Sequence, residues 1–272
     1  MFKDITIGQY YPVDSLIHRL DPRTKLVFTF VYIILLFVIN NVWGYMIASV
    51  LLITTIVLCK IPVKYIFNGL KAIILIILLT VILNLFMTPG KTVAVIGPLK
   101  ITEEGIRNSV FLAIRLIYLI VGTNIMTLTT SPIDLTDGME QLMKYIPFVR
   151  RYAHEIAMMM SIALRFIPTL IEETDKIMQA QMARGADLDS GNLFKKAKAL
   201  IPILIPLFVS AFHRADELAT AMEARCYRGG QGRTRMKVLR YEKRDVVVYV
   251  LMFILIGCII ASRFIPGKIW IF

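Results

Sequence analysis

The stretch Lys25–Lys60, KLVFTFVYIILLFVINNVWGYMIASVLLITTIVLCK, carries no charge between its two terminal lysines. About 20 apolar residues cross the hydrocarbon core of a bilayer, so this run is too long for one span. The segment 40–45, NNVWGY, interrupts it with the aromatic residues typical of a membrane interface. The run therefore predicts two spans, at about 26–42 and 44–59, joined by a short turn.

Three further apolar runs predict three further spans. The first lies between Lys71 and Lys91 and ends in a Pro-Gly turn, and the others cover about 106–130 and 246–262. The whole chain of 272 residues is 57% hydrophobic, with a mean hydropathy of +0.69. These values exclude an ordinary soluble domain and indicate an all-α polytopic membrane protein with about five transmembrane helices.

Smaller features refine the fourth span. Residues 93–100 alternate β-forming side chains around Gly97-Pro98 and predict a small hairpin or an irregular loop. Thr102 followed by two glutamates is typical of a helix start. We expect Arg115 near one end of this helix, where it either reaches the interface or forms a structural pair.

The distribution of lysine and arginine predicts the orientation. The N-terminal flank and the loop between the second and third spans are basic, whereas the loop between the first two spans has no basic residue. Basic loops stay in the cytoplasm, so we expect a cytoplasmic N-terminus, a cytoplasmic segment 131–244 and an external tail after Arg263. The same rule explains the net charge of +12, and we do not expect nucleic-acid binding.

The segment 131–244 is helical by pattern but does not contain ordinary spans. Its apolar run 156–171 is broken by Arg165 and Pro168, and its run 199–212 is short and contains two prolines. Such runs are more typical of buried or interfacial helices. An alternative counts both as spans, giving seven, and leaves every other orientation unchanged.

The two halves of this segment resemble each other. Each has an apolar stretch with proline, then acidic residues, then an arginine between small residues, at Ala183-Arg184-Gly185 and Ala224-Arg225-Cys226. The pattern predicts two long helices with equivalent tips; Gly185 is a natural helix stop, and Tyr227-Arg228-Gly229-Gly230 supplies the second. A cation there complements the helix dipole, which is a purely structural interpretation. The small neighbours favour a second one, in which each guanidinium enters a groove on another protein and binds a carboxylate.

Methionine is concentrated in the same segment, where nine of the 14 lie. Flexible methionines suit surfaces that accept several partners, although they also fill cores. The three histidines are isolated, and the three cysteines lack metal or redox spacing and are expected to be small buried residues. The sequence also lacks a phosphate-binding glycine-rich loop, so we expect a protein that is not an enzyme and has no metal or cofactor of its own.

Three features together resemble the transmembrane coupling subunit, or T component, of energy-coupling factor (ECF) transporters. Asp14-Ser15 and the following Leu20-Asp21-Pro22-Arg23-Thr24-Lys25 are similar to the N-terminal signature of that family. Asp21 and Pro22 also suit the cap and first position of a helix. The second feature is the pair of small-Arg-small motifs, in which Cys226 replaces glycine but is still small. The third is the layout of several spans, a long helical segment and one last span.

The resemblance implies four regions: a cytoplasmic N-terminal segment (1–25), a four-helix transmembrane region (26–130), cytoplasmic or interfacial coupling helices (131–244), and a last transmembrane helix with a short external tail (245–272). It implies a multi-pass subunit of the bacterial cell membrane that couples two ABC-type ATPases to a small membrane-embedded substrate-binding S component, for uptake of a vitamin or micronutrient. ATP would be bound by the partner subunits. The alternative from the residues alone is a self-contained secondary transporter or other permease.

The resemblance also implies roles for individual residues. Each small-Arg-small tip would dock on one ATPase, and Asp21, Pro22, Arg23 and Lys25 would be the N-terminal signature. The apolar faces of the long helices, at about 150–228, would hold the S component. The candidate contact residues there are Met158, Met159, Met160, Met178 and Met182.

Overall fold

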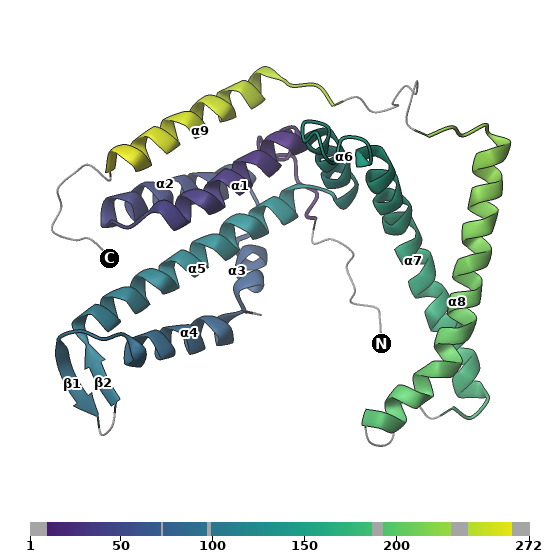
Figure 1. Ribbon diagram of the computed structural model, residues 1–272, viewed down its shortest axis with the longest axis horizontal. Coiled ribbons are helices and arrows are strands. Elements are labelled where there is room, and N and C mark those ends of the chain that lie inside the picture. Colours follow the sequence, from purple (N-terminus) through teal and green to yellow (C-terminus); the bar gives the residue numbers. More distant parts are fainter. Residues whose placement is uncertain (1–9, 72, 97–98, 187–192, 230–238, 263–272) are drawn as a thin grey trace. The chain divides into compact units, whose positions relative to one another are not determined.

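The protein, a computed structural model, is almost entirely helical (Figure 1). Residues 10–71, 73–96, 99–186, 193–229 and 239–262 are described. They group into two units: the helical bundle, made of residues 10–138 and 239–262, and the long-helix unit, made of residues 139–229. The expected all-α fold is confirmed.

The helical bundle contains six helices and one hairpin. Helix α5 (Glu103–Thr129) contacts α1 (Pro22–Val38), α2 (Val42–Cys59), α3 (Val63–Lys71) and α4 (Ile74–Met87), and α9 (Lys243–Ser262) packs on α1 and α2. The core between them is aliphatic and aromatic, with Leu36, Ile39 and Ile66 almost fully buried. The outer faces of α2, α4 and α9 expose large apolar side chains, as lipid-facing helices do.

Among the described residues, five helices are long and apolar enough to cross a membrane: α2, α5, α7 (Ala153–Ala183), residues 198–224 of α8 (Leu193–Ala224), and α9. The sequence also predicted five spans, but the helices that qualify are not the same five. Helix α1 has only 17 residues and α4 only 14, and α4 reaches spanning length only together with α3, from which it is bent by 58°. Helices α7 and α8, which were expected to be interfacial, also have the length and composition of membrane spans, as the seven-span alternative assumed.

The predicted turns and helix starts are confirmed where they can be compared. Asn41 caps α2 by accepting from the Gly44 N–H at 3.0 Å, and its amide donates to the Ser262 carbonyl at 2.6 Å. Strands β1 (Thr92–Ile96) and β2 (Leu99–Thr102) form an antiparallel hairpin. Thr102 then caps α5 through the Gly105 N–H. The bend between α1 and α2 thus also anchors the end of α9.

Arg115 forms a structural pair. Its Nε donates to the Tyr45 hydroxyl at 3.0 Å and one of its terminal nitrogens donates to the Ile39 carbonyl at 2.9 Å. Ile39 is the residue that ends α1, so the arginine satisfies an otherwise orphaned helix-end carbonyl. The expected position near a helix end was wrong, since Arg115 lies near the middle of α5. Of the cysteines only Cys59 is buried; Cys226 and Cys258 are exposed, contrary to expectation.

The long-helix unit is dominated by α7 and α8, which run antiparallel to each other. Glu173 on α7 contacts Ser210 and lies 3.2 Å from Arg214 on α8, whereas Gln181, further along α7, reaches back to Pro202. Pro206 has no N–H to give to the Pro202 carbonyl, and the Gln181 amide supplies the missing donor at 3.2 Å. The prolines that interrupt the apolar pattern are therefore accommodated inside one continuous helix.

Helix α6 (Pro132–Met143) passes from one unit to the other. Its Gly138 lies against α1, because an added Cβ there would meet the Pro22 side chain at 3.0 Å and Leu26 at 3.3 Å. Two residues later, Glu140 belongs to the long-helix unit and is almost fully buried. A single short helix thus carries the covalent connection between the bundle and α7.

Candidate functional site

The first small-Arg-small tip is a complete Schellman cap. Helix α7 ends at Ala183, Arg184 is the cap residue and Gly185 adopts a left-handed conformation with φ +86°. The Ala186 N–H donates to the Gln181 carbonyl at 3.0 Å and the Gly185 N–H to the Met182 carbonyl at 2.9 Å, which are the two bonds that define the motif. Glycine is favoured here because it carries no Cβ to clash.

The second tip repeats this geometry residue for residue. Helix α8 ends at Ala224, the Tyr227 N–H donates to the Met222 carbonyl at 3.0 Å, and the Cys226 N–H donates to the Glu223 carbonyl at 2.8 Å. Cys226 takes the glycine position with φ +55°. The helix therefore ends before the glycines at 229–230 that were expected to stop it. Replacing glycine by cysteine at this position costs stability, because a left-handed residue with a Cβ is strained by about 1–2 kcal/mol.

Both guanidinium groups are free for a partner within the described part of the chain. Arg184 and Arg225 are exposed, as are their small neighbours, and neither has an ion-pair partner among the described residues. No atom of the described chain lies within 4 Å of a Cβ built on Gly185. The caps already satisfy the helix-end carbonyls with backbone N–H groups, so the arginine side chains are not needed for that purpose.

The two tips lie at opposite ends of the antiparallel pair. Arg184 comes one turn after Gln181, which contacts Pro202, and Arg225 follows Pro202 by 23 positions. At about 1.5 Å per helical residue, this separates the tips by roughly 35 Å. A separation of this size allows each tip to meet a different partner.

The second tip is also fixed by side chains, through a short chain of hydrogen bonds. The Tyr227 hydroxyl lies 3.2 Å from His154 Nε2, and His154 Nδ1 lies 3.4 Å from the Glu140 carboxylate. Lys144 reaches the same carboxylate oxygen at 3.2 Å. The residue that completes the Arg225 cap is thereby linked to the start of α7 and the end of α6. Sequence reasoning treated His154 as isolated, because its partners are 14 and 73 positions away.

The candidate methionines are divided between exposed and half-buried positions. Met159, Met160 and Met182 are exposed, at 59%, 37% and 49%, and Met158 and Met178 are half-buried. Helix α8 adds a larger apolar stripe at helical spacing, which the methionine pattern did not indicate. It consists of Leu200, Ile201, Leu204, Ile205, Phe208, Val209 and Phe212, all at least 49% exposed.

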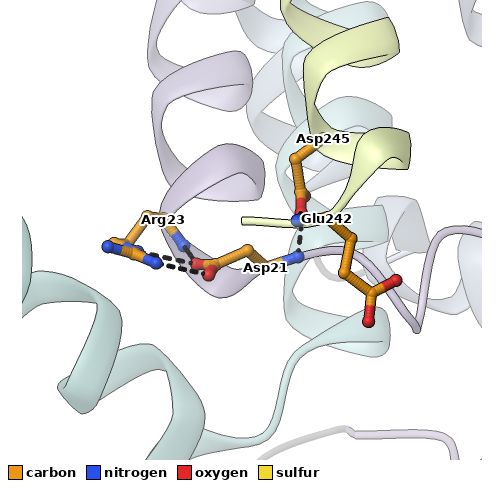
Figure 2. Close-up of polar contacts among 4 residues, drawn as sticks. All are labelled: Asp21, Arg23, Glu242 and Asp245. Carbon is orange, nitrogen blue, oxygen red and sulfur yellow. Dashed lines mark hydrogen bonds and ion pairs between the residues drawn. The ribbon is translucent and has the colours of Figure 1, made fainter. Parts of the chain in front are cut away.

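The N-terminal signature forms a buried ionic cluster in the bundle (Figure 2). Asp21 caps α1 by accepting from the Arg23 N–H at 2.9 Å, with Pro22 in the first turn as expected. The Arg23 guanidinium folds back onto both Asp21 oxygens and lies 3.9 Å from the Tyr241 ring centre. Asp245, which the sequence analysis did not select, accepts from the N–H groups of Asp21 at 3.0 Å and Glu242 at 2.9 Å.

Lys25 extends this cluster to α5. Its ammonium group donates to the carbonyls of Thr129, at 2.8 Å, and His18, at 3.2 Å. His18 in turn bonds the Ser15 hydroxyl and the Tyr11 carbonyl, and burial lowers the pKa of His18. The signature therefore joins the starts of α1 and α9 to the end of α5. Asp245 was missed because an acid before an apolar run looks like an ordinary helix start.

We predict opposite effects of substitutions at the two cap positions. Cys226→Gly should stabilise the protein by about 1 kcal/mol because it removes the left-handed strain, and Gly185→Ala should destabilise it by a similar amount. Thermal unfolding in one detergent measures both. Gly257→Ala is the control, since that glycine is helical with open space around it and should not be destabilised. A lower melting temperature for Cys226→Gly would contradict the cap geometry.

We also predict that Asp245→Ala destabilises the bundle by about 2 kcal/mol or more, because two N–H groups, one of them buried, lose their acceptor. Asp245→Asn, which keeps one acceptor oxygen, should give an intermediate melting temperature. The exposed Asp216 on α8 provides the control Asp216→Ala. Equal melting temperatures for the two alanine variants would show that the cluster in Figure 2 contributes no stability.

Known proteins that are similar in sequence to this chain belong to one family of membrane transport subunits. The family described as CbiQ, cobalt transport protein, matches residues 14–237. The energy-coupling factor transporter transmembrane protein EcfT of Thermosediminibacter oceani is 56% identical over 97% of this chain and 99% of its own length. Those of Clostridium kluyveri and Bacillus subtilis are 53% and 47% identical over 98% and 97% of this chain, and each is covered completely. The chain belongs to the EcfT family, the energy-coupling transmembrane subunits of ECF transporters.

Proposed function

We propose that this chain is the scaffold of an ECF-type ABC importer, and that each of its two tips binds one cytoplasmic ATPase. The observation that carries the proposal is the pair of matching Schellman caps with exposed guanidinium groups and no ion-pair partner in the described chain. A guanidinium can form a bidentate bond with a carboxylate in a groove. The exposed alanines and the open space at Gly185 allow such a groove to close around the tip.

The distance between the tips supports two separate ATPases. At roughly 35 Å the tips are about one small domain diameter apart, so one groove does not accommodate both. ATP binding by the partners would draw the two ATPases together and move both tips. The contacts among Glu173, Ser210 and Arg214, and between Gln181 and Pro202, would pass this movement from one long helix to the other.

The S component would lie on the apolar faces of the same helices. The exposed methionines of α7 and the stripe of α8 at 200–212 give that partner both a deformable and a rigid apolar surface. Two apolar membrane surfaces associate through close packing. In this arrangement the chain binds neither the vitamin or micronutrient nor ATP, and it has no catalytic residue or cofactor of its own. Specificity for the transported molecule would reside in the S component.

We predict that Arg184→Glu combined with Arg225→Glu abolishes co-purification of the ATPases and substrate uptake, while the chain still inserts into the membrane. Losing one partner of a buried ion pair costs about 3–5 kcal/mol, so each single reversal should weaken binding more than a hundredfold. Arg165→Glu, an exposed arginine in the middle of α7, is the matched control and should retain the ATPases. Normal ATPase recovery with the double variant would exclude docking through the tips.

The orientation is tested separately by labelling single cysteines in a variant without native cysteines. We predict that Arg184→Cys and Arg225→Cys react with an impermeant maleimide only after the cells are opened, because the basic loops place this segment inside. Lys91→Cys, beside the β1–β2 hairpin on the opposite side of the predicted topology, should react in intact cells. The reverse pattern would invert the proposed topology.

A further inference from the structure

The helical bundle contains a pocket of about 180 Å³ between α1, α2, α5 and α9. Its wall is almost entirely apolar, with Phe28, Tyr32, Leu52, Ile125 and Leu251 among the lining residues. An engineered apolar cavity of about 150 Å³ stays free of water and takes up benzene, so a pocket with this wall favours an apolar guest.

The lining residues place the pocket in one leaflet. Most come from the N-terminal halves of α1 and α9 and from the C-terminal halves of α2 and α5, and Ile17 and Leu20 come from the segment before α1. These four helix ends meet on the side of the N-terminal signature, which the basic loops assign to the cytoplasm. Further along the helices Tyr32 closes the pocket against Gly122, where a Cβ would overlap the Tyr32 ring.

The end of the pocket near the signature is polar and incompletely satisfied. Thr24 is one of the lining residues. Its side chain is 0% exposed, and its buried hydroxyl oxygen, which lies behind the pocket wall, has no hydrogen-bond partner among the described residues. The neighbouring Lys25 ammonium has three protons and, within the described part of the chain, donates to two acceptors, the carbonyls of His18 and Thr129. A buried hydroxyl without a partner costs about 1–3 kcal/mol. Both groups require an acceptor oxygen, which the apolar wall does not supply.

We propose that this pocket binds one acyl chain of a membrane glycerolipid, with an ester oxygen at Thr24 and Lys25. An acyl chain matches the apolar wall, and an ester carbonyl is an acceptor of the kind both residues need. A glycerolipid places its ester groups at the polar boundary of the leaflet and its chains in the hydrocarbon, which is the order of polar and apolar groups along this pocket. The site depends on the bilayer alone and not on the ATPases or the S component.

The test uses the full-length chain in phosphatidylcholine nanodiscs that contain a trace of phosphatidylglycerol with a photoreactive diazirine in one acyl chain. Peptide mass spectrometry then locates the cross-links. We expect labelling of pocket residues on α1, α2 and α5 in the wild type. Thr29→Phe, which fills the pocket, should remove that labelling. Thr80→Phe on α4, outside the pocket, should leave it unchanged. Labelling of the exposed face of α4 serves as the internal reference for lipids that surround the protein.

A second variant tests the polar end. Thr24→Val keeps the shape and removes the hydroxyl, so it should lower lipid retention about fivefold, the size of one net hydrogen bond, while the delipidated variant melts no lower than the wild type. Thr80→Val is its control. Pocket labelling that persists in Thr29→Phe, labelling by a free fatty acid probe but not by the glycerolipid, or equal retention by Thr24→Val and the wild type would each overturn the proposal.

Discussion

Helix ends determine this structure, because lipid offers no hydrogen bonds to the backbone groups that a helix leaves unpaired. In the bundle several of these ends are satisfied by side chains from distant parts of the sequence, in addition to local caps such as Asp21 and Thr102. Arg115 binds the carbonyl at the end of α1, Asn41 binds the carbonyl at the end of α9, and Asp245 accepts the N–H that precedes α1. The polar residues of this apolar unit are therefore mostly structural. They fix which helix end lies beside which, and the apolar residues between them complete the packing.

In the long-helix unit the backbone groups at the helix ends are also paired, and the side chains of Arg184 and Arg225 take no part in this pairing. Both helix ends are closed by backbone N–H groups, and the carbonyl freed by Pro206 is satisfied by Gln181. Neither tip arginine is needed to satisfy the carbonyls that these backbone N–H groups reach. What each contributes to its own helix is the favourable interaction of a cation with the helix dipole, which leaves its hydrogen-bond donors for a partner.

The sequence was sufficient for features that depend on local pattern. Charge-free runs predicted five of the six bundle helices but not α3, which lies in the segment expected to be a basic loop. Asp21 and Thr102 were recognised as caps, and two small-Arg-small motifs predicted equivalent helix ends. What it missed depends on pairs separated by many positions, such as Asp21 with Asp245 and Gln181 with Pro202. The left-handed conformation of Cys226 was also missed, since cysteine, unlike glycine, does not favour a positive φ angle. Arg115 was misplaced although the predicted span, about 106–130, nearly matches α5: Arg115 is the 13th of the 27 residues of α5, past its first turns.

The structure also shows that the equivalent tips differ in what holds them. The Arg184 cap is followed by an alanine and ends in an unstrained glycine, so backbone hydrogen bonds alone define it. The Arg225 cap contains a strained cysteine and is completed by Tyr227, which is tied through His154 to Glu140 on α6. Helix α6 continues into the bundle, where Gly138 packs on the start of α1. The two similar motifs are consequently held by different contacts: the Arg184 tip by backbone hydrogen bonds of its own helix, and the Arg225 tip also by side chains of α6 and α7.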